Sequence, residues 1–130
     1  TLDEKQRPYP ESPSGIPGVQ TILPLLLLAV KEGWLSLEQI PLLTAAGPAR
    51  IYDIQKKGTI APDFDGDLTI VDLNVTSPLP LEWLHSRAGS SPYLGLPLAG
   101  WPTTTILRGR VVYDTHAPIG EPDGEPAVLA

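Results

Sequence analysis

The chain has 130 residues, with 9 basic and 15 acidic side chains, so its formal net charge is −6. This length suits one modest domain, and an acidic chain without a lysine or arginine cluster argues against nucleic acid or an anionic membrane as the primary partner. Cysteine is absent, which excludes disulfides, thiolate zinc sites and a cysteine nucleophile. Methionine is also absent, so we expect a chain that is processed, excised or incomplete.

Residues 1–18 predict a loop-like lead-in, because prolines fix the backbone and remove hydrogen-bond donors. Residues 19–32 predict a helix that is apolar on every side, which is typical of a core helix. Pro24 suits its first turn, and Gly33 suits the position after its end. The apolar run is shorter than the roughly 20 residues of a membrane span. The polar first residues carry no signal peptide. We therefore expect a cytoplasmic protein.

A second helical segment follows. Ser36 and Gln39 have the spacing of a capping box, which predicts a helix that runs to about Ala46 and stops at Gly47. Pro48 can then open a further turn or two. Both predicted helices are largely apolar, so they need a large surface to pack against.

The second half of the chain is strand-like. The sequence predicts strands at 68–73, 103–107 and 111–113, with Gly109 in a hairpin turn and coil over 77–102. Residues 115–130 predict a mobile acidic tail. Three or so strands make a poor independent sheet, so we expect further strands elsewhere.

Few residues suggest chemistry by themselves. His85 and His116 have no second ligand at metal-binding spacing, and we interpret them as surface or packing residues. The aspartates at 63, 65 and 67 are similar to a calcium loop, but the glycine comes two positions early, so we interpret them as a solvated turn. Ser90 has no nearby acid–base pair.

The loop over residues 12–18 carries more information. Two prolines and two glycines stand directly before the apolar helix. Such a loop can present backbone groups to a ligand at a helix N-terminus, or it can be a tight turn into the helix. The residues alone leave both interpretations open.

The order of several motifs resembles the C-terminal third of dihydroorotases, which belong to the amidohydrolase superfamily. The similarity extends over about residues 1–114. The motifs that carry it are residues 1–5, 13–21, 23–27, 32–37, 47–52, 58–68, 91–95 and 105–113.

The resemblance implies an α/β fold: the C-terminal part of a (β/α)8 metal-dependent hydrolase barrel, with the C-terminal share of a small β-sandwich. Residues 1–57 would be the last barrel loop and its helices. Residues 58–114 would form the C-terminal part of the composite β-sandwich, and residues 115–130 would be the acidic tail. The rest of the barrel, upstream, would then be the principal partner.

The implied activity is the zinc-dependent, reversible hydrolysis of L-dihydroorotate to N-carbamoyl-L-aspartate in pyrimidine (UMP) biosynthesis. No metal ligand of the family, and not its catalytic aspartate, maps onto this chain. Only Ser14 and Gly15 match functional positions, in a loop that contacts the substrate through backbone groups. We therefore expect the parent enzyme to hold the zinc with residues outside this chain, and the chain alone to be inactive.

Other interpretations remain. Dihydropyrimidinase and allantoinase carry a related loop with different residues. A non-catalytic dihydroorotase-like subunit that scaffolds aspartate transcarbamoylase would share the fold without the ligands. A freestanding binding module is disfavoured by the unpaired strands. Besides a small-molecule substrate, the resemblance implies a homo-oligomer or aspartate transcarbamoylase as a partner.

Overall fold

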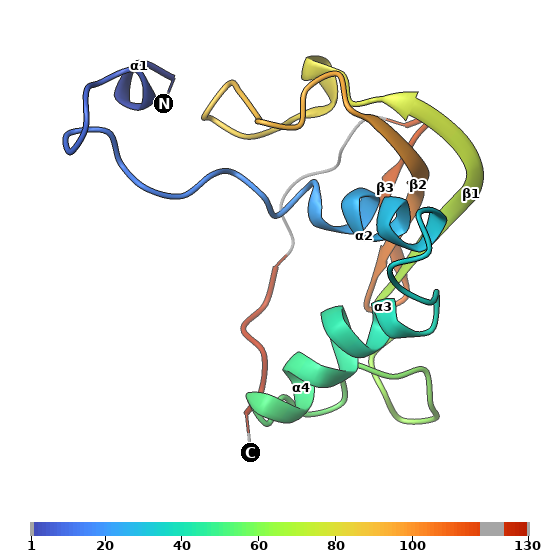
Figure 1. Ribbon diagram of the computed structural model, residues 1–130. Helices are drawn as coiled ribbons and strands as arrows, with labels where there is room; N and C mark the ends of the chain where they lie inside the picture. The colour runs from blue at the N-terminus through green and yellow to red at the C-terminus, as the bar shows by residue number, and fades with distance from the viewer. Residues whose placement is uncertain (1, 118–123, 130) are drawn as a thin grey trace.

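The computed structural model describes residues 2–117 and 124–129, with helices first and a sheet second, as Figure 1 shows. The mixture of helix and strand agrees with the predicted α/β class. The helical half holds α1 (Leu2–Lys5), α2 (Ile22–Lys31), α3 (Gln39–Pro41), a π-helical turn (Leu42–Ala46) and α4 (Gly47–Ile51). The second half holds β1 (Leu68–Pro78), a 3-10 turn (Leu81–Trp83), β2 (Pro97–Leu107) and β3 (Arg110–Asp114).

The predicted helix over 19–32 is confirmed as α2. Pro24 lies buried in its first turn, where a missing backbone donor costs little. Gly33 follows the C-cap with a φ of +77°, a conformation that glycine adopts without strain. The helix thus ends where its sequence provides a stop.

The predicted stop at Gly47 is wrong, because the helix continues from α3 through the π-helical turn into α4. Half of the predicted capping box is present, since the Ser36 backbone N–H donates to Gln39 Oε1 at 2.7 Å. Pro48 cannot donate, and its ring crowds the carbonyl four residues earlier, so the helix widens there instead of ending. The Gly47 N–H reaches back to the Leu42 carbonyl, and a Cβ on Gly47 would lie 2.5 Å from that oxygen.

The three strands form one antiparallel sheet in the order β1-β2-β3. All three predicted strands lie within them, and the hairpin turn at Arg108–Gly109 has φ values of 49° and 76°. The predicted coil over 77–102 is wrong at both ends. Pairing with β1 draws residues from Pro97 onward into β2, with Pro78 opposite Pro97. Strand partners thus override the proline-rich local signal.

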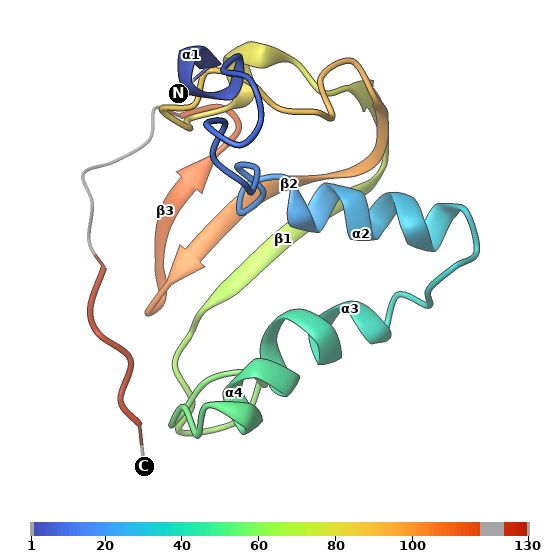
Figure 2. The same ribbon diagram turned by 60° about the vertical axis from the view of Figure 1, so that its left-hand side comes forward.

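The core lies where α2 crosses the sheet, as Figure 2 shows. Leu27 of α2 and Leu98 of β2 are buried. Gly100 has a φ of +83°, and a Cβ there would lie 2.9 Å from Leu27 Cδ1, so glycine lets the helix rest directly on β2. The buried residues of the described part of the chain are Thr21, Pro24, Leu27, Ile40, Leu79, Leu98, Ala99 and Gly100.

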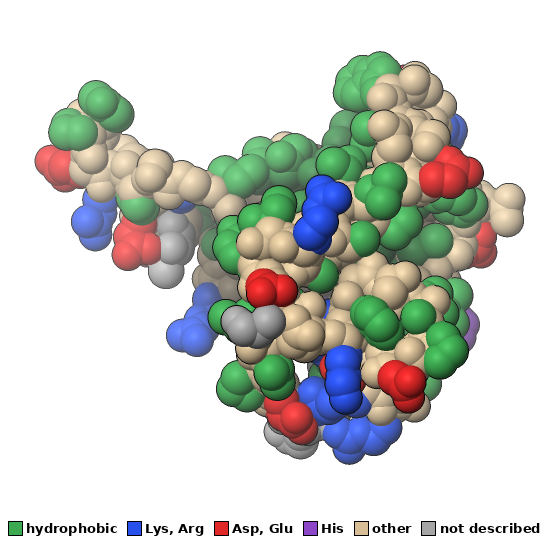
Figure 3. All heavy atoms as spheres, turned by 90° about the horizontal axis from the view of Figure 1, so that it is seen from below, with side chains coloured by type: hydrophobic (Ala, Val, Ile, Leu, Met, Phe, Trp, Pro, Cys, Tyr) green, Lys and Arg blue, Asp and Glu red, His purple; other side chains and the backbone are tan. Residues whose placement is uncertain are grey.

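Many large apolar side chains remain exposed on the remaining helices and on β1. Figure 3 shows hydrophobic side chains spread over the face seen from below. A folded chain rarely leaves this much apolar surface to water unless a partner covers it. Examples from the two regions are Leu42, Leu43, Ile51, Tyr52, Ile70, Leu73 and Val75.

The predicted mobile tail is wrong for residues 124–129. Ile54 forms an antiparallel bridge with Leu129, and the neighbouring Gln55 N–H donates to the Val128 carbonyl at 2.9 Å. Arg108 pairs with Glu125 at 3.4 Å. The prediction for 118–123 lies outside the described residues. Within residues 2–117 and 124–129, no helix is long and apolar enough to span a membrane.

Candidate functional site

The predicted loop around Ser14 and Gly15 is exposed and held by its own lead-in. Gly15 has a φ of +81°. The Lys5 ammonium donates to the carbonyls of Pro13 and Gly15, and Ser12 Oγ donates to the Lys5 carbonyl at 3.2 Å. The short helix α1 therefore brings a cation back onto the loop. Sequence reasoning missed this role, for which the only signal is a lysine beside a glycine-rich loop.

A tight turn connects this loop to α2. The Gly18 carbonyl accepts hydrogen bonds from the backbone N–H groups of Thr21 at 3.1 Å and Ile22 at 3.0 Å. Thr21 Oγ1 donates to the same carbonyl at 3.2 Å, and the Thr21 side chain is buried. The interpretation as a tight turn into the helix is therefore confirmed at Gly18. Ligand binding by Ser14 and Gly15, which are exposed, stays a prediction.

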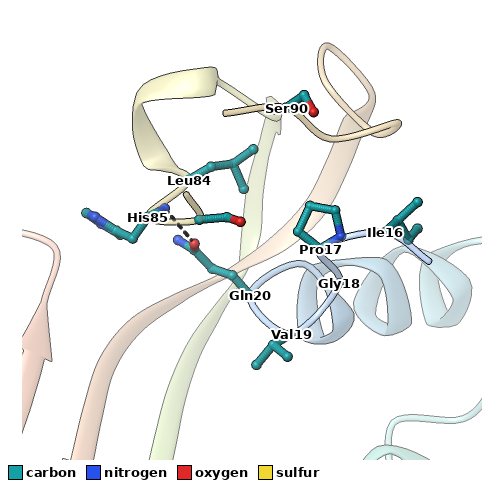
Figure 4. A pocket seen from close by; sticks show the side chains of 9 residues that line it. Ile16, Pro17, Gly18, Val19, Gln20, Leu84, His85 and Ser90 are labelled. Atoms are coloured by element: carbon teal, nitrogen blue, oxygen red, sulfur yellow. Dashed lines mark hydrogen bonds between the residues drawn. The ribbon is translucent and has the colours of Figure 1, made fainter. Parts of the chain in front are cut away.

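A pocket of about 530 Å³ lies beside the loop, between residues 16–20 and 84–90. Figure 4 shows Ile16, Pro17 and Leu84 around it, with the His85 imidazole directed away. The walls are mostly apolar. The residues that line it are Ile16, Pro17, Gly18, Val19, Gln20, Leu84, His85, Ser86 and Ser90.

Gln20 joins the two walls of this pocket. Its Nε2 donates to the Trp83 carbonyl, and its Oε1 accepts from the His85 backbone N–H at 3.0 Å, as Figure 4 shows for the second bond. Sequence reasoning missed Gln20, since one glutamine beside a turn gives no signal of a contact more than 60 residues away.

The residues present do not form a zinc site. Across the described ranges, no group of three or more His, Asp or Glu side chains is placed to hold a metal ion. His85 contacts Gln20 through its backbone, and the His116 backbone N–H donates to Asp114 Oδ1 at 2.8 Å, as in an ordinary turn. A zinc ion would therefore need ligands from residues other than these.

The aspartates near residue 65 form a structural ion cluster. Lys57 Nζ lies 2.8 Å from Asp65 Oδ2 and 2.5 Å from Asp67 Oδ2. Two hydrogen bonds lower the pKa of Asp67 below its ordinary value of 3.8. The larger effect comes from Lys57, and the smaller one from the Arg108 backbone N–H. The same pairing, with Asp65 first, raises the pKa of Lys57 above 10.5. The predicted turn is confirmed, and its carboxylates bind a lysine and a backbone amide.

Comparison with known proteins identifies the family. The model of the amidohydrolase family matches residues 18–112, which is most of the chain. This chain belongs to the amidohydrolase family. The match includes the Gly18 turn, Gln20, α2, β1, β2 and the first part of β3.

Within that family, several curated relatives are dihydroorotases. The dihydroorotase of Methanothermobacter thermautotrophicus is 38% identical over 85% of this chain and 26% of its own length. That of Pyrococcus abyssi is 37% identical over 98% of this chain and 30% of its own length. The amidohydrolase chain described here therefore spans under a third of these relatives.

Solved structures in the same family share the fold. The L-hydantoinase (dihydropyrimidinase) of Arthrobacter aurescens has a TM-score of 0.79 and 32% identity, over 85% of this chain and 25% of its own. The dihydropyrimidinase of Brevibacillus agri has a TM-score of 0.80 and 25% identity, over 87% of this chain and 25% of its own. The arrangement of α2 on a small antiparallel sheet is thus a known amidohydrolase arrangement.

Proposed function

We propose that this chain is the C-terminal portion of a dihydroorotase, a cyclic amide hydrolase that interconverts L-dihydroorotate and N-carbamoyl-L-aspartate in pyrimidine biosynthesis. The observation that carries the proposal is the exposed Ser14–Gly15 loop, which Lys5 holds at the approach to α2. The match to the Pyrococcus abyssi dihydroorotase covers 128 residues and so includes this loop.

The loop has the chemistry to bind a cyclic amide. Such a ring offers N–H donors and carbonyl acceptors, and a loop with exposed backbone groups can pair with both kinds. The positive φ of Gly15 turns its peptide groups without a side chain in the way. In this proposal Ser14 and Gly15 bind and orient the substrate, and they take no part in bond cleavage.

Zinc is the proposed cofactor of the parent enzyme. Because the described residues offer no ligand set, the ligands would come from other parts of the parent. The 130-residue chain alone is therefore proposed to be inactive.

The exposed apolar surfaces support a place within a larger polypeptide. We propose that residues 1–57 form the last loop and helices of a (β/α)8 barrel, and that residues 58–114 complete a β-sandwich with strands from elsewhere in the parent. Exposed Leu42 and Leu43 on the helical side, with Ile70 on β1, would then be covered. Cytoplasmic location, homo-oligomerisation and association with aspartate transcarbamoylase stay predictions.

One observation favours a second candidate. The solved structures similar to this chain include a hydantoinase and a dihydropyrimidinase with TM-scores of 0.79 and 0.80. Both names describe hydrolysis of a cyclic amide, but of a different ring. The sequence relatives favour dihydroorotate, because the dihydroorotases reach 40% identity and these two solved structures 32% and 25%.

The test is an activity assay of the full-length natural protein that contains this chain, preceded by its intact mass and coding sequence. L-Dihydroorotate, dihydrouracil, hydantoin and allantoin are supplied separately to the zinc-loaded protein. We expect turnover of dihydroorotate, with the other rings at least ten times slower by kcat/KM, on the order of one lost polar contact. Preference for dihydrouracil, hydantoin or allantoin would reassign the enzyme within the cyclic amidases. A folded protein inactive on all four would favour the non-catalytic scaffold.

A further inference from the structure

The segment over residues 84–90 follows Trp83, whose indole lies edge-on to Trp101 with ring centroids 5.1 Å apart and donates to the Tyr113 hydroxyl at 3.4 Å. Beyond Trp83, one long-range hydrogen bond holds the described segment, and Gln20 accepts it. Its other hydrogen bonds in the described structure are local: Leu84 N–H to the Leu81 carbonyl at 3.0 Å and Gly89 N–H to the Ser86 carbonyl at 3.2 Å. The Ala88 N–H donates to Ser86 Oγ at 3.2 Å, which is local as well. The contact of Gln20 with His85 is the long-range one. The sheet therefore anchors the start of this wall at Trp83, and Gln20 ties the next residues to the loop side.

Gln20 itself is fixed at its backbone. It lies in the turn closed by the Thr21 N–H and the Gly18 carbonyl at 3.1 Å, and Thr21 is buried beside it. Its planar amide has a donor nitrogen and an acceptor oxygen, and both pair with backbone groups at and just after the end of the 3-10 turn: Nε2 with the Trp83 carbonyl and Oε1 with the His85 N–H. A carboxylate cannot donate, and a shorter amide cannot keep the same reach.

We infer that Gln20 is a positioning residue, which couples the Ser14–Gly15 loop to the 84–90 segment and sets the width of the pocket between them. The expected effect of Gln20 on substrate binding rests on the proposed function. In this inference Gln20 does not contact the substrate. It acts through the Gly18 turn, so that the loop on one side and the segment on the other keep a fixed separation.

The variants Gln20→Glu and Gln20→Met of the full-length protein test this inference. Met keeps the length and apolar volume of the side chain but makes neither hydrogen bond. Glu keeps the acceptor and loses the donor when it is ionised, and regains the donor when it is protonated. Gln6→Glu is the matched control, because it makes the same chemical change at an exposed position in the lead-in.

The first measurement is amide hydrogen exchange, compared with the unmodified protein at each pH. At neutral pH we expect both Gln20 variants to exchange faster in residues 84–90 and in residues 14–19, while α2 stays protected. Below about pH 4, where a free glutamate protonates, Gln20→Glu should regain protection and Gln20→Met should not. His85 and Tyr113 are the titratable residues that line a pocket together with Gln20, and Gln20→Met controls for both because it keeps them unchanged. Faster exchange in only one of the two segments, or no recovery of Gln20→Glu, would overturn the coupling.

The second measurement is steady-state kinetics on L-dihydroorotate. We expect KM to rise about two- to tenfold in both Gln20 variants, the size of one net hydrogen bond, with kcat within twofold. Equal losses of kcat and of folded protein would instead indicate a general folding defect. If the unmodified protein hydrolyses no cyclic amide, the proposed function fails, and the exchange experiment still decides whether Gln20 couples the two walls.

Discussion

The two helical regions of the chain are both rich in apolar residues, but their surroundings differ. Helix α2 lies on β2, and its Leu27 is 4% exposed. In the segment from α3 to α4, Ile40 is buried, but Leu42 and Leu43 are 60% and 55% exposed. Both segments are apolar, so composition predicts burial for both. The difference shows that α2 has its packing partner in this chain, and that the described residues leave Leu42 and Leu43 uncovered. In our proposal the rest of the barrel covers them.

The largest expected effect breaks the α2 contact directly. Gly100→Val adds a Cβ that would lie 2.9 Å from Leu27 Cδ1, at a φ of +83° that a β-branched residue avoids. Overpacking and backbone strain together should lower the free energy of unfolding by about 3 kcal/mol or more. Urea unfolding followed by circular dichroism measures this loss.

Gly95 provides the control for that substitution. It has a φ of +76°, but a Cβ there would meet nothing within 4 Å. Gly95→Ala and Gly100→Ala therefore share the backbone strain and differ in the contact with Leu27. Equal destabilisation by the two would show that α2 does not pack tightly on β2.

A second test compares the two helical regions. Leu27→Ala should destabilise this chain by about 2–4 kcal/mol, because it leaves a cavity under α2. Leu42→Ala should change the stability of the chain by less than about 0.5 kcal/mol, since Leu42 is exposed. In the full-length protein we expect the Leu42→Ala loss to grow to at least about 1 kcal/mol, as the barrel covers it. An unchanged small loss would leave the second helical face without a partner.

The loop ahead of α2 provides a third and smaller effect. Gly15→Val should weaken substrate binding in the full-length protein by about 1–3 kcal/mol, measured as a rise in KM. A clash within the chain is not the cause, because a Cβ on Gly15 would meet nothing within 4 Å. The cause is the backbone φ of +81°, which a β-branched residue avoids. Gly33→Val repeats this strain at a φ of +77° away from the loop and should leave KM unchanged.

The smallest effect concerns the ion cluster that joins the helical and sheet regions. The pKa of Asp67 is lowered, so its stabilisation is complete above its ordinary pKa of 3.8 and is lost as pH falls through the lowered value. The pKa of Lys57 is raised, so the stabilisation that its charged form contributes is complete below its ordinary pKa of 10.5. This stabilisation is lost as the pH rises through the raised pKa.

Asp67→Asn should therefore flatten the acid side of the stability profile. The pair is partly exposed, so the loss at neutral pH should stay below about 1 kcal/mol. Unfolding measured between about pH 2 and 7 checks this. An acid limb as steep as that of the unmodified chain would assign the pH dependence to other carboxylates.

Local signals predicted a good part of the fold. The apolar run with Pro24 and Gly33 predicted α2, and β-branched runs with a glycine turn predicted the three strands. The same signals failed at Gly47, where helix geometry absorbed Pro48, and at Pro97, where pairing with Pro78 extended β2. The two failures have different causes: at Gly47 a change of helix type outweighed a local stop signal, and at Pro97 a strand neighbour distant in sequence did so.

The candidate site divides in the same way. The sequence by itself determined the Ser14–Gly15 loop and its resemblance to dihydroorotases, because prolines, glycines and motif order are local information. Only the tertiary structure decided that Lys5 holds this loop, that Gln20 joins it to His85, and that 124–129 pair with Ile54 and Gln55. Those contacts form between segments that folding brings together, and a single lysine or glutamine carries no mark of its partner.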